Sequence, residues 1–215
     1  MAHKIGQNLI LGINRKTIVI IIISSAVFFL IFSSKYLRTY EPDKECYFIQ
    51  DGNHSICVSI KKNKKGGSSI ISSERIGTIE NIISEWELSY PVFHFECADI
   101  NADGTDDILA GVIKATRFDS ICRKRIFIFK LFDGYVRPLW MGSRVSQPLE
   151  DFKVIQSKPI NLIRTIELEE NGNFLVAEYK WKGFGLTFVK YIVRNCNQQK
   201  ARKIFNQTNT NYESN

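Results

Sequence analysis

Apolar and polar positions divide the chain into two parts with different periodicity. The stretch Thr17–Ser34 reads TIVIIIISSAVFFLIFSS and contains no charged residue. From Cys46 onward, apolar residues fall in short runs of strand length that are separated by turn dipeptides such as Asp133-Gly134 and Lys182-Gly183. Such runs are typical of β-strands in hairpins. The pattern predicts one transmembrane helix followed by an all-β domain of antiparallel sheets.

The apolar run is long enough for a membrane anchor. About 20 apolar residues cross a bilayer as a helix, and residues 17–37 supply that length. A cleaved signal peptide is the alternative, but Phe32 stands where cleavage after Ser34 would need a small residue. A buried core helix is a poorer fit because no face of the run is polar. We therefore expect a cytoplasmic tail at 1–16, the anchor at 17–37 and a linker at 38–45.

The β domain is expected at 46–194. Its predicted strands include an apolar segment at 125–132, which is apolar on both faces and so is expected at the centre of a sheet. Residues 70–85 fit either a helix or a strand, because isoleucines recur at helical spacing although β-branched residues dominate. Residues 195–215 are rich in Asn and Gln with few apolar groups, and predict a disordered tail.

Net charge changes the picture less than its total of +7 suggests. Four of the 29 basic residues flank the apolar run, and no acidic residue precedes Glu41. The 25 basic and 22 acidic residues that remain give the domain a balance of only +3. The sequence therefore predicts no nucleic-acid binding. The basic stretch 61–69 is expected to be a solvated loop, with lipid headgroup contact as the alternative.

One acidic loop carries the candidate chemistry of the domain. It runs from Asp99 to Asp107 as D-I-N-A-D-G-T-D-D. Calcium binds six to eight oxygen ligands from carboxylates, amides and carbonyls. The expected ligands alternate along the loop and comprise Asp99, Asn101, Asp103, Thr105 (through its carbonyl) and Asp107. The alternative is a turn whose carboxylates cap backbone amides.

The loop matches an EF-hand at its first nine positions but has Ala110 where the twelfth needs a glutamate. With its flanking strands, the segment from Phe95 to about Trp140 resembles the calcium loop of FG-GAP and VCBS repeats, which are β-propeller blade units. The stretch 140–152 is also similar to membrane-anchored bacterial proteins that carry one such loop. The resemblance implies blade-like sheets or a sandwich, one structural Ca²⁺, and a location in the bacterial inner membrane. A short tail ahead of a single anchor usually stays in the cytosol, so we expect the domain in the periplasm or outside. The Phe-Gly and Gly-Ala-Pro signatures of FG-GAP repeats are absent from the chain.

Five cysteines raise the question of disulfides. If Asp51-Gly52 is a two-residue turn, Cys46 lies opposite Cys57, at a separation that a disulfide can span. The alternative is two buried thiols. Cys97 and Cys122 either pair or pack as small hydrophobes, and an odd cysteine is left over.

No catalytic or phosphate-binding motif is present in the sequence. His94 is expected to be packed or solvent-facing rather than a ligand, and the three tryptophans to be core residues rather than a ligand groove. Four glutamates are expected to face solvent, namely Glu167, Glu169, Glu170 and Glu178. The sequence favours a membrane-anchored module that binds a protein or glycan partner. The alternatives are an accessory subunit of a membrane complex and a calcium-dependent hydrolase.

Overall fold

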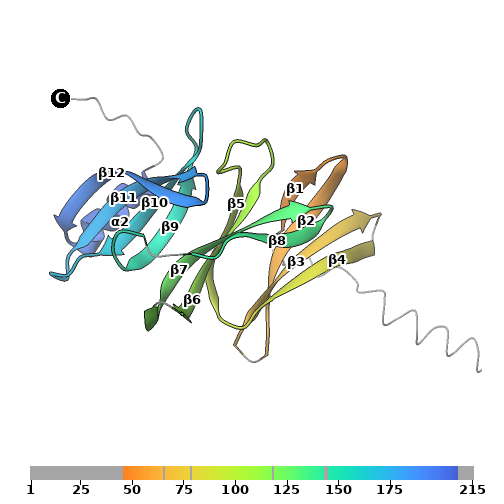
Figure 1. Ribbon diagram of the computed structural model, residues 1–215, viewed down its shortest axis with the longest axis horizontal. Helices are drawn as coiled ribbons and strands as arrows, with labels where there is room; N and C mark the ends of the chain where they lie inside the picture. The colour runs from red at the N-terminus through yellow and green to blue at the C-terminus, as the bar shows by residue number, and fades with distance from the viewer. Residues whose placement is uncertain (1–45, 65, 78, 118, 143–144, 208–215) are drawn as a thin grey trace, which may run out of the picture. The chain divides into compact units, whose positions relative to one another are not determined.

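The computed structural model describes residues 46–64, 66–77, 79–117, 119–142 and 145–207. They form three four-stranded antiparallel sheets, coloured from orange to blue in Figure 1. The first sheet contains β1 (Tyr47–Asp51), β2 (His54–Lys62), β3 (Ser68–Ile76) and β4 (Ile79–Leu88). The second contains β5 (Val92–Ala98), β6 (Asp107–Thr116), β7 (Asp119–Phe132) and β8 (Tyr135–Trp140). The third contains β9 (Leu149–Ile155), β10 (Leu162–Leu168), β11 (Phe174–Lys182) and β12 (Gly185–Cys196).

Each sheet is a meander, in which strands that follow one another in sequence also lie side by side. The expected all-β fold of antiparallel sheets is thereby confirmed. Residues 70–85, which left helix and strand open, belong to β3 and β4. The predicted central strand at 125–132 belongs to β7, which lies between β6 and β8.

The predicted tail, anchor and linker at 1–16, 17–37 and 38–45 lie outside the described residues. Among the residues that the structure describes, no helix is both long enough and apolar enough to span a membrane.

The middle sheet presents apolar residues on both of its faces. In β7, Phe127 and Phe129 point into one core, which they share with Ile49 and Ile70 of the first sheet. The side chains between them point the other way, because successive strand residues face opposite sides. Ile126 and Ile128 thus enter a second core with Phe152 and Ile163 of the third sheet. This double burial explains why the four consecutive residues 126–129 are apolar.

A helix occupies part of the segment that we expected to be a disordered tail. Residues Gln198–Asn206 form helix α2, and the side chain of Asn197 caps its first turn by accepting from the backbone N–H of Lys200. Ala201 and Phe205 of α2 are buried against Val176 and Ile166 of the third sheet. The low apolar content misled the prediction, because two buried side chains suffice to hold this short helix.

The prediction that four glutamates face solvent was wrong for three of them. Glu167, Glu169 and Glu178 are buried rather than exposed to solvent. Each finds polar partners inside the third sheet: Glu169 accepts from Arg194 at 2.7 Å, and Glu167 accepts from the hydroxyl of Tyr179 at 2.8 Å. Burial of a carboxylate is tolerated when such partners satisfy it.

The deepest of these pairs joins the third sheet to helix α2. Arg164 is fully buried, and its Nε and Nη2 donate to Oε1 of Glu178 at 3.1 and 2.8 Å. Its Nη1 donates to the carbonyl oxygens of Ile204 and Gln207 at the end of α2. One side chain therefore neutralises a buried carboxylate and also donates to backbone carbonyls at the end of the helix, including that of Ile204, which accepts from the amide of Gln207 as well.

Candidate functional site

The acidic loop connects β5 to β6 at one end of the middle sheet. Its backbone takes two left-handed conformations, at Ala102 (φ 62°) and Gly104 (φ 87°). Gly104 adopts its left-handed conformation without strain, whereas the side chain of Ala102 makes this conformation energetically unfavourable. The chain therefore curls tightly between Asp99 and Asp107.

Backbone amides hold three of the predicted ligand side chains inside this curl. Asp99 accepts from the amides of Ala102 and Gly104 at 2.7 and 2.9 Å. The Oδ1 atoms of Asn101 and Asp103 each accept from the amide two residues further on, at 2.8 and 2.9 Å. Asn101 Nδ2 also donates to Asp103 Oδ2 at 3.0 Å. The structure thus brings Asp99, Asn101 and Asp103 together in one turn.

The other two predicted ligands have different surroundings. The backbone N–H of Thr105 donates to Oδ1 of Asp103 at 2.9 Å. Asp107 is buried at the start of β6, and its Oδ2 accepts from the amide of Ile100 at 3.3 Å. Burial and then the negative charges of Asp103 and Asp99 raise the pKa of Asp107 to about 7. Asp107 therefore lies close enough to Asp99 and Asp103 for their negative charges to raise its pKa.

The donors of this loop are all oxygens, which suits a hard cation such as Ca²⁺. Each of the carboxylate and amide oxygens that accept one N–H keeps a further lone pair. Across the described ranges, no three His, Cys, Asp or Glu side chains are already arranged as a metal-binding group. The ion would be held by the side chains of Asp99, Asn101, Asp103 and Asp107 and by the carbonyl of Thr105. The hydrogen bonds to the loop amides also cap the turn without the ion.

Asn161 supports the loop and was missed by the sequence analysis. Its Nδ2 donates to the backbone oxygen of Asp99 at 2.8 Å, and its Oδ1 accepts from the amide of Ser157. Asn161 lies just before β10, 62 residues away in sequence from Asp99. Local sequence patterns do not predict the contact between Asn161 and Asp99, because it depends on the packing of the third sheet against the second.

A second polar cluster lies where β5 meets β9. The His94 ring nitrogens lie 3.4 Å from Asp151 and 3.5 Å from Glu96, and Asp151 also accepts from Arg202 of α2 at 2.7 Å. Burial alone would lower the pKa of His94, but the bonds to Asp151 and Glu96 outweigh it and raise the pKa to about 9. His94 is therefore a partly buried cation that links two sheets.

We expect the stability of the domain to depend on His94 between pH 6.5 and 9. A histidine whose pKa is raised from 6.5 to about 9 on folding contributes stability that is complete below pH 6.5. That contribution is lost as the pH rises through about 9. We expect a loss of about 2 kcal/mol, after discounting for partial exposure. Urea unfolding of the wild type and of His94→Gln across this range measures it. A wild type that loses no more stability than His94→Gln contradicts the assignment.

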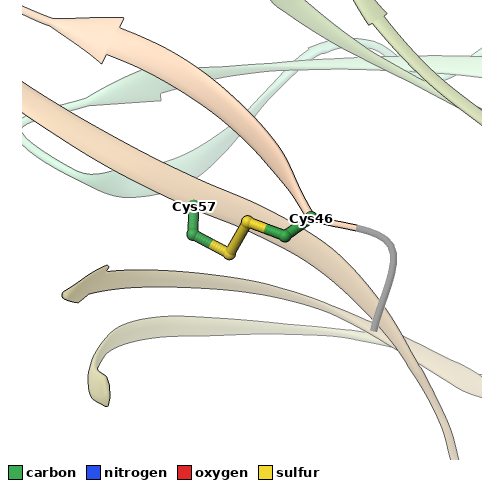
Figure 2. Close-up of a disulfide and its surroundings, with 2 residues drawn as sticks. All are labelled: Cys46 and Cys57. Carbon is green, nitrogen blue, oxygen red and sulfur yellow. A yellow bond between two sulfur atoms is a disulfide. The ribbon is translucent and has the colours of Figure 1, made fainter. Parts of the chain in front are cut away.

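The structure joins Cys46 to Cys57 in a disulfide with a Cα–Cα distance of 5.6 Å (Figure 2). The register behind the prediction was nevertheless wrong. Asp51 pairs with His54, so Gly52 and Asn53 form the turn and Phe48 lies opposite Cys57. The turn is displaced by one residue because Asp51 is held at the strand end, where it accepts from the amide of Gly134. Cys97, Cys122 and Cys196 are free thiols.

A cavity of about 250 Å³ lies beside this first hairpin. Its polar lining comprises Asp51, His54, Glu74 and Asp133. His54 Nδ1 lies 3.0 Å from Glu74, which raises the pKa of the exposed imidazole by hydrogen bonding and by charge. The sequence did not single out this cavity, because β3 and the β7–β8 turn complete it from distant positions.

The tryptophans are packing residues, as expected. Trp86 contacts Phe129 edge to face with ring centroids 5.9 Å apart, and Trp140 and Trp181 pack against the second core. Comparison with known protein families, with curated protein sequences and with solved structures finds no match to this chain.

Proposed function

We propose that the chain is a membrane-anchored, extracytoplasmic binding module of the FG-GAP/VCBS type, stabilised by one Ca²⁺ in the loop from Asp99 to Asp107. The observation that carries this proposal is the gathering of Asp99, Asn101 and Asp103 within a single turn. Carboxylates crowded in this way repel one another, and a divalent cation offsets the repulsion. The ion would fasten the β5–β6 connection of the middle sheet.

The sheet arrangement supports the comparison with propeller blades. Each blade of a propeller is a four-stranded antiparallel sheet, and the chain has four-stranded meanders that share cores with their neighbours. The acidic loop joins the first two strands of the middle sheet. Because a full propeller needs at least four blades and the described residues provide three sheets, we propose blade-like sheets rather than a closed propeller.

The disulfide supports the proposed side of the membrane. Disulfides persist in oxidising compartments such as the periplasm and are rare in the cytosol, and Cys46–Cys57 lies at the start of the β domain. Together with the expected anchor at 17–37, the disulfide supports a location of the domain outside the cytoplasm. Labelling of intact cells with a membrane-impermeant reagent tests the orientation, at a cysteine introduced for Asn206 in a chain whose exposed free thiol Cys122 is replaced by serine. Labelling only after the cytoplasmic side is opened would reverse it.

Calcium should raise the melting temperature of the wild-type chain. A ligand that binds the folded state when its free concentration is 100 times its dissociation constant adds about 2.7 kcal/mol, which corresponds to a shift of roughly 5–11 °C for a domain of this size. Melting is measured in calcium and in chelator. Asp103→Asn should remove the calcium-dependent rise, because an amide still accepts from the Thr105 amide but carries no charge.

The matched control is Glu170→Ala, which changes an exposed carboxylate in the turn between β10 and β11. It should keep the full calcium-dependent rise. Asp99→Ala should lower the melting temperature even in chelator, because it removes two hydrogen bonds to loop amides, and should also abolish the calcium effect. Identical melting of the wild type in calcium and in chelator contradicts the proposal.

A further inference from the structure

The tip of the β11–β12 hairpin carries an apolar side chain that projects into solvent. Lys182 pairs with Gly185, so Gly183 and Phe184 form the turn. Phe184 is 97% exposed, the highest exposure among the large hydrophobic side chains of the described residues. A phenylalanine in this position adds nothing to the core, and its exposure to water is unfavourable.

Exposed apolar residues continue from the tip along β12. Phe188, Val189 and Tyr191 are all exposed, and the rings of Phe188 and Tyr191 lie 4.6 Å apart. β12 is the edge strand of the third sheet, where it pairs only with β11. We call the exposed side chains of this region the basic aromatic edge; it comprises Lys180, Lys182, Phe184, Phe188, Val189, Lys190 and Tyr191.

The charge of this region is one-sided. Between Asn171 and Gln207 there are seven basic residues, Lys180, Lys182, Lys190, Arg194, Lys200, Arg202 and Lys203, and one acidic residue, Glu178. Glu178 is buried and is neutralised by Arg164, while the charge of Arg194 is offset by Glu169. Lys190 Nζ lies 3.6 Å from Oε2 of Glu178, so that carboxylate offsets part of its charge. The edge therefore keeps the excess positive charge of Lys180 and Lys182.

We propose that the basic aromatic edge binds the surface of an anionic lipid bilayer, with Phe184 inserted among the headgroups. Lysines near such a surface each contribute attraction to anionic lipids, and aromatic side chains favour the interface. A projecting turn with one apolar tip suits a soft surface into which it can insert. Because the tip can insert, we favour an anionic lipid surface over an acidic protein as the partner. This inference goes beyond the calcium-stabilised module and depends on neither the ion nor the anchor.

The test compares amide hydrogen exchange of the full chain in two kinds of lipid nanodisc. One contains phosphatidylcholine alone, and the other contains equal parts of phosphatidylcholine and phosphatidylglycerol. Exchange is measured for the amides of residues 180–191, so it detects contact of this hairpin with lipid even if another segment holds the chain in the disc. We expect slower exchange at 180–191 in the anionic discs, and loss of that protection at 1 M salt, where the Debye length falls to about 3 Å.

Two variants should remove the protection, and one should keep it. Phe184→Ser removes the inserted ring, and Lys180→Glu/Lys182→Glu reverses two charges, which should weaken binding roughly 25-fold or more at about 1 kcal/mol per charge. The matched control is Phe132→Ser, because Phe132 is also an exposed phenylalanine beside a hairpin turn, but next to Asp133. Both tips are exposed, so all variants should keep the wild-type melting temperature.

Equal exchange at 180–191 in the two kinds of disc would overturn the proposal. Equal loss of protection in Phe132→Ser and Phe184→Ser would also overturn it, because insertion would then not be specific to this hairpin. Protection by soluble polyglutamate but by neither disc would assign the edge to an acidic protein instead and would equally reject a lipid surface.

Discussion

Replacing Arg164 with methionine should lower the unfolding free energy of the domain by about 3–5 kcal/mol, the range for breaking a buried ion pair. The substitution leaves Glu178 buried and without its guanidinium, and it also removes the side-chain donor to the carbonyls of Ile204 and Gln207. Helix α2 should therefore loosen as the sheet weakens. Urea unfolding measures the loss, and amide exchange across 198–206 measures the loosening.

A double variant separates the unpaired charge from the lost packing. Arg164→Met/Glu178→Leu removes both charges and fills the space with apolar groups, which is often close to neutral for stability. We expect it to recover most of the loss, although α2 still lacks its Arg164 donor. If the double variant is as unstable as Arg164→Met alone, the buried carboxylate is not the source of the loss.

Phe152→Ala should be similarly damaging, at about 3–5 kcal/mol, because it opens a cavity in a packed core. Phe152 reaches from β9 to the middle sheet, where its ring lies 4.5 Å from that of His94 and 6.4 Å from that of Phe93. It packs so closely over Gly111 of β6 that a Cβ there would lie 2.9 Å from the Phe152 ring and 2.7 Å from that of Phe93. Unfolding by urea should show the cavity cost directly.

Coupling between the two positions tests this packing. Gly111→Ala alone should destabilise the domain by about 1–3 kcal/mol through overpacking. In the Phe152→Ala background the added methyl enters the vacated space, so the double variant should be more stable than the sum of the single effects. Strict additivity would mean that the second and third sheets do not meet at Gly111.

Local signals explain why the strands could be predicted. Alternation and turn dipeptides located the hairpin at Asp133-Gly134, since both signals depend only on neighbouring residues. They also located the β11–β12 hairpin, although its turn is Gly183-Phe184 rather than the predicted Lys182-Gly183. The segment at 125–132, which is apolar on both faces, correctly indicated a central strand, because its residues 126–129 are buried in separate cores on the two faces of the sheet.

Distant partners explain what the sequence did not reveal. Helix α2 depends on Arg164 of β10, 40 residues from Ile204, and the buried glutamates depend on partners in other strands. The first turn shifted because Asp51 binds Gly134, 83 residues away. In the candidate site, Asp99, Asn101 and Asp103 were predictable because the loop is continuous, whereas Asn161 reaches it only through the packing of the third sheet.

The most direct test of the account is a calorimetric titration of the full chain with Ca²⁺ after removal of divalent ions by chelator. We predict one bound ion per wild-type chain, no binding by Asp99→Asn or Asp103→Asn, and unchanged binding by Glu170→Ala. Absence of binding heat in the wild type, with equilibrium dialysis also showing no retained calcium, would contradict the central claim. The oxygens of Asp99 and Asp103 would then serve only to cap the amides of their own turn.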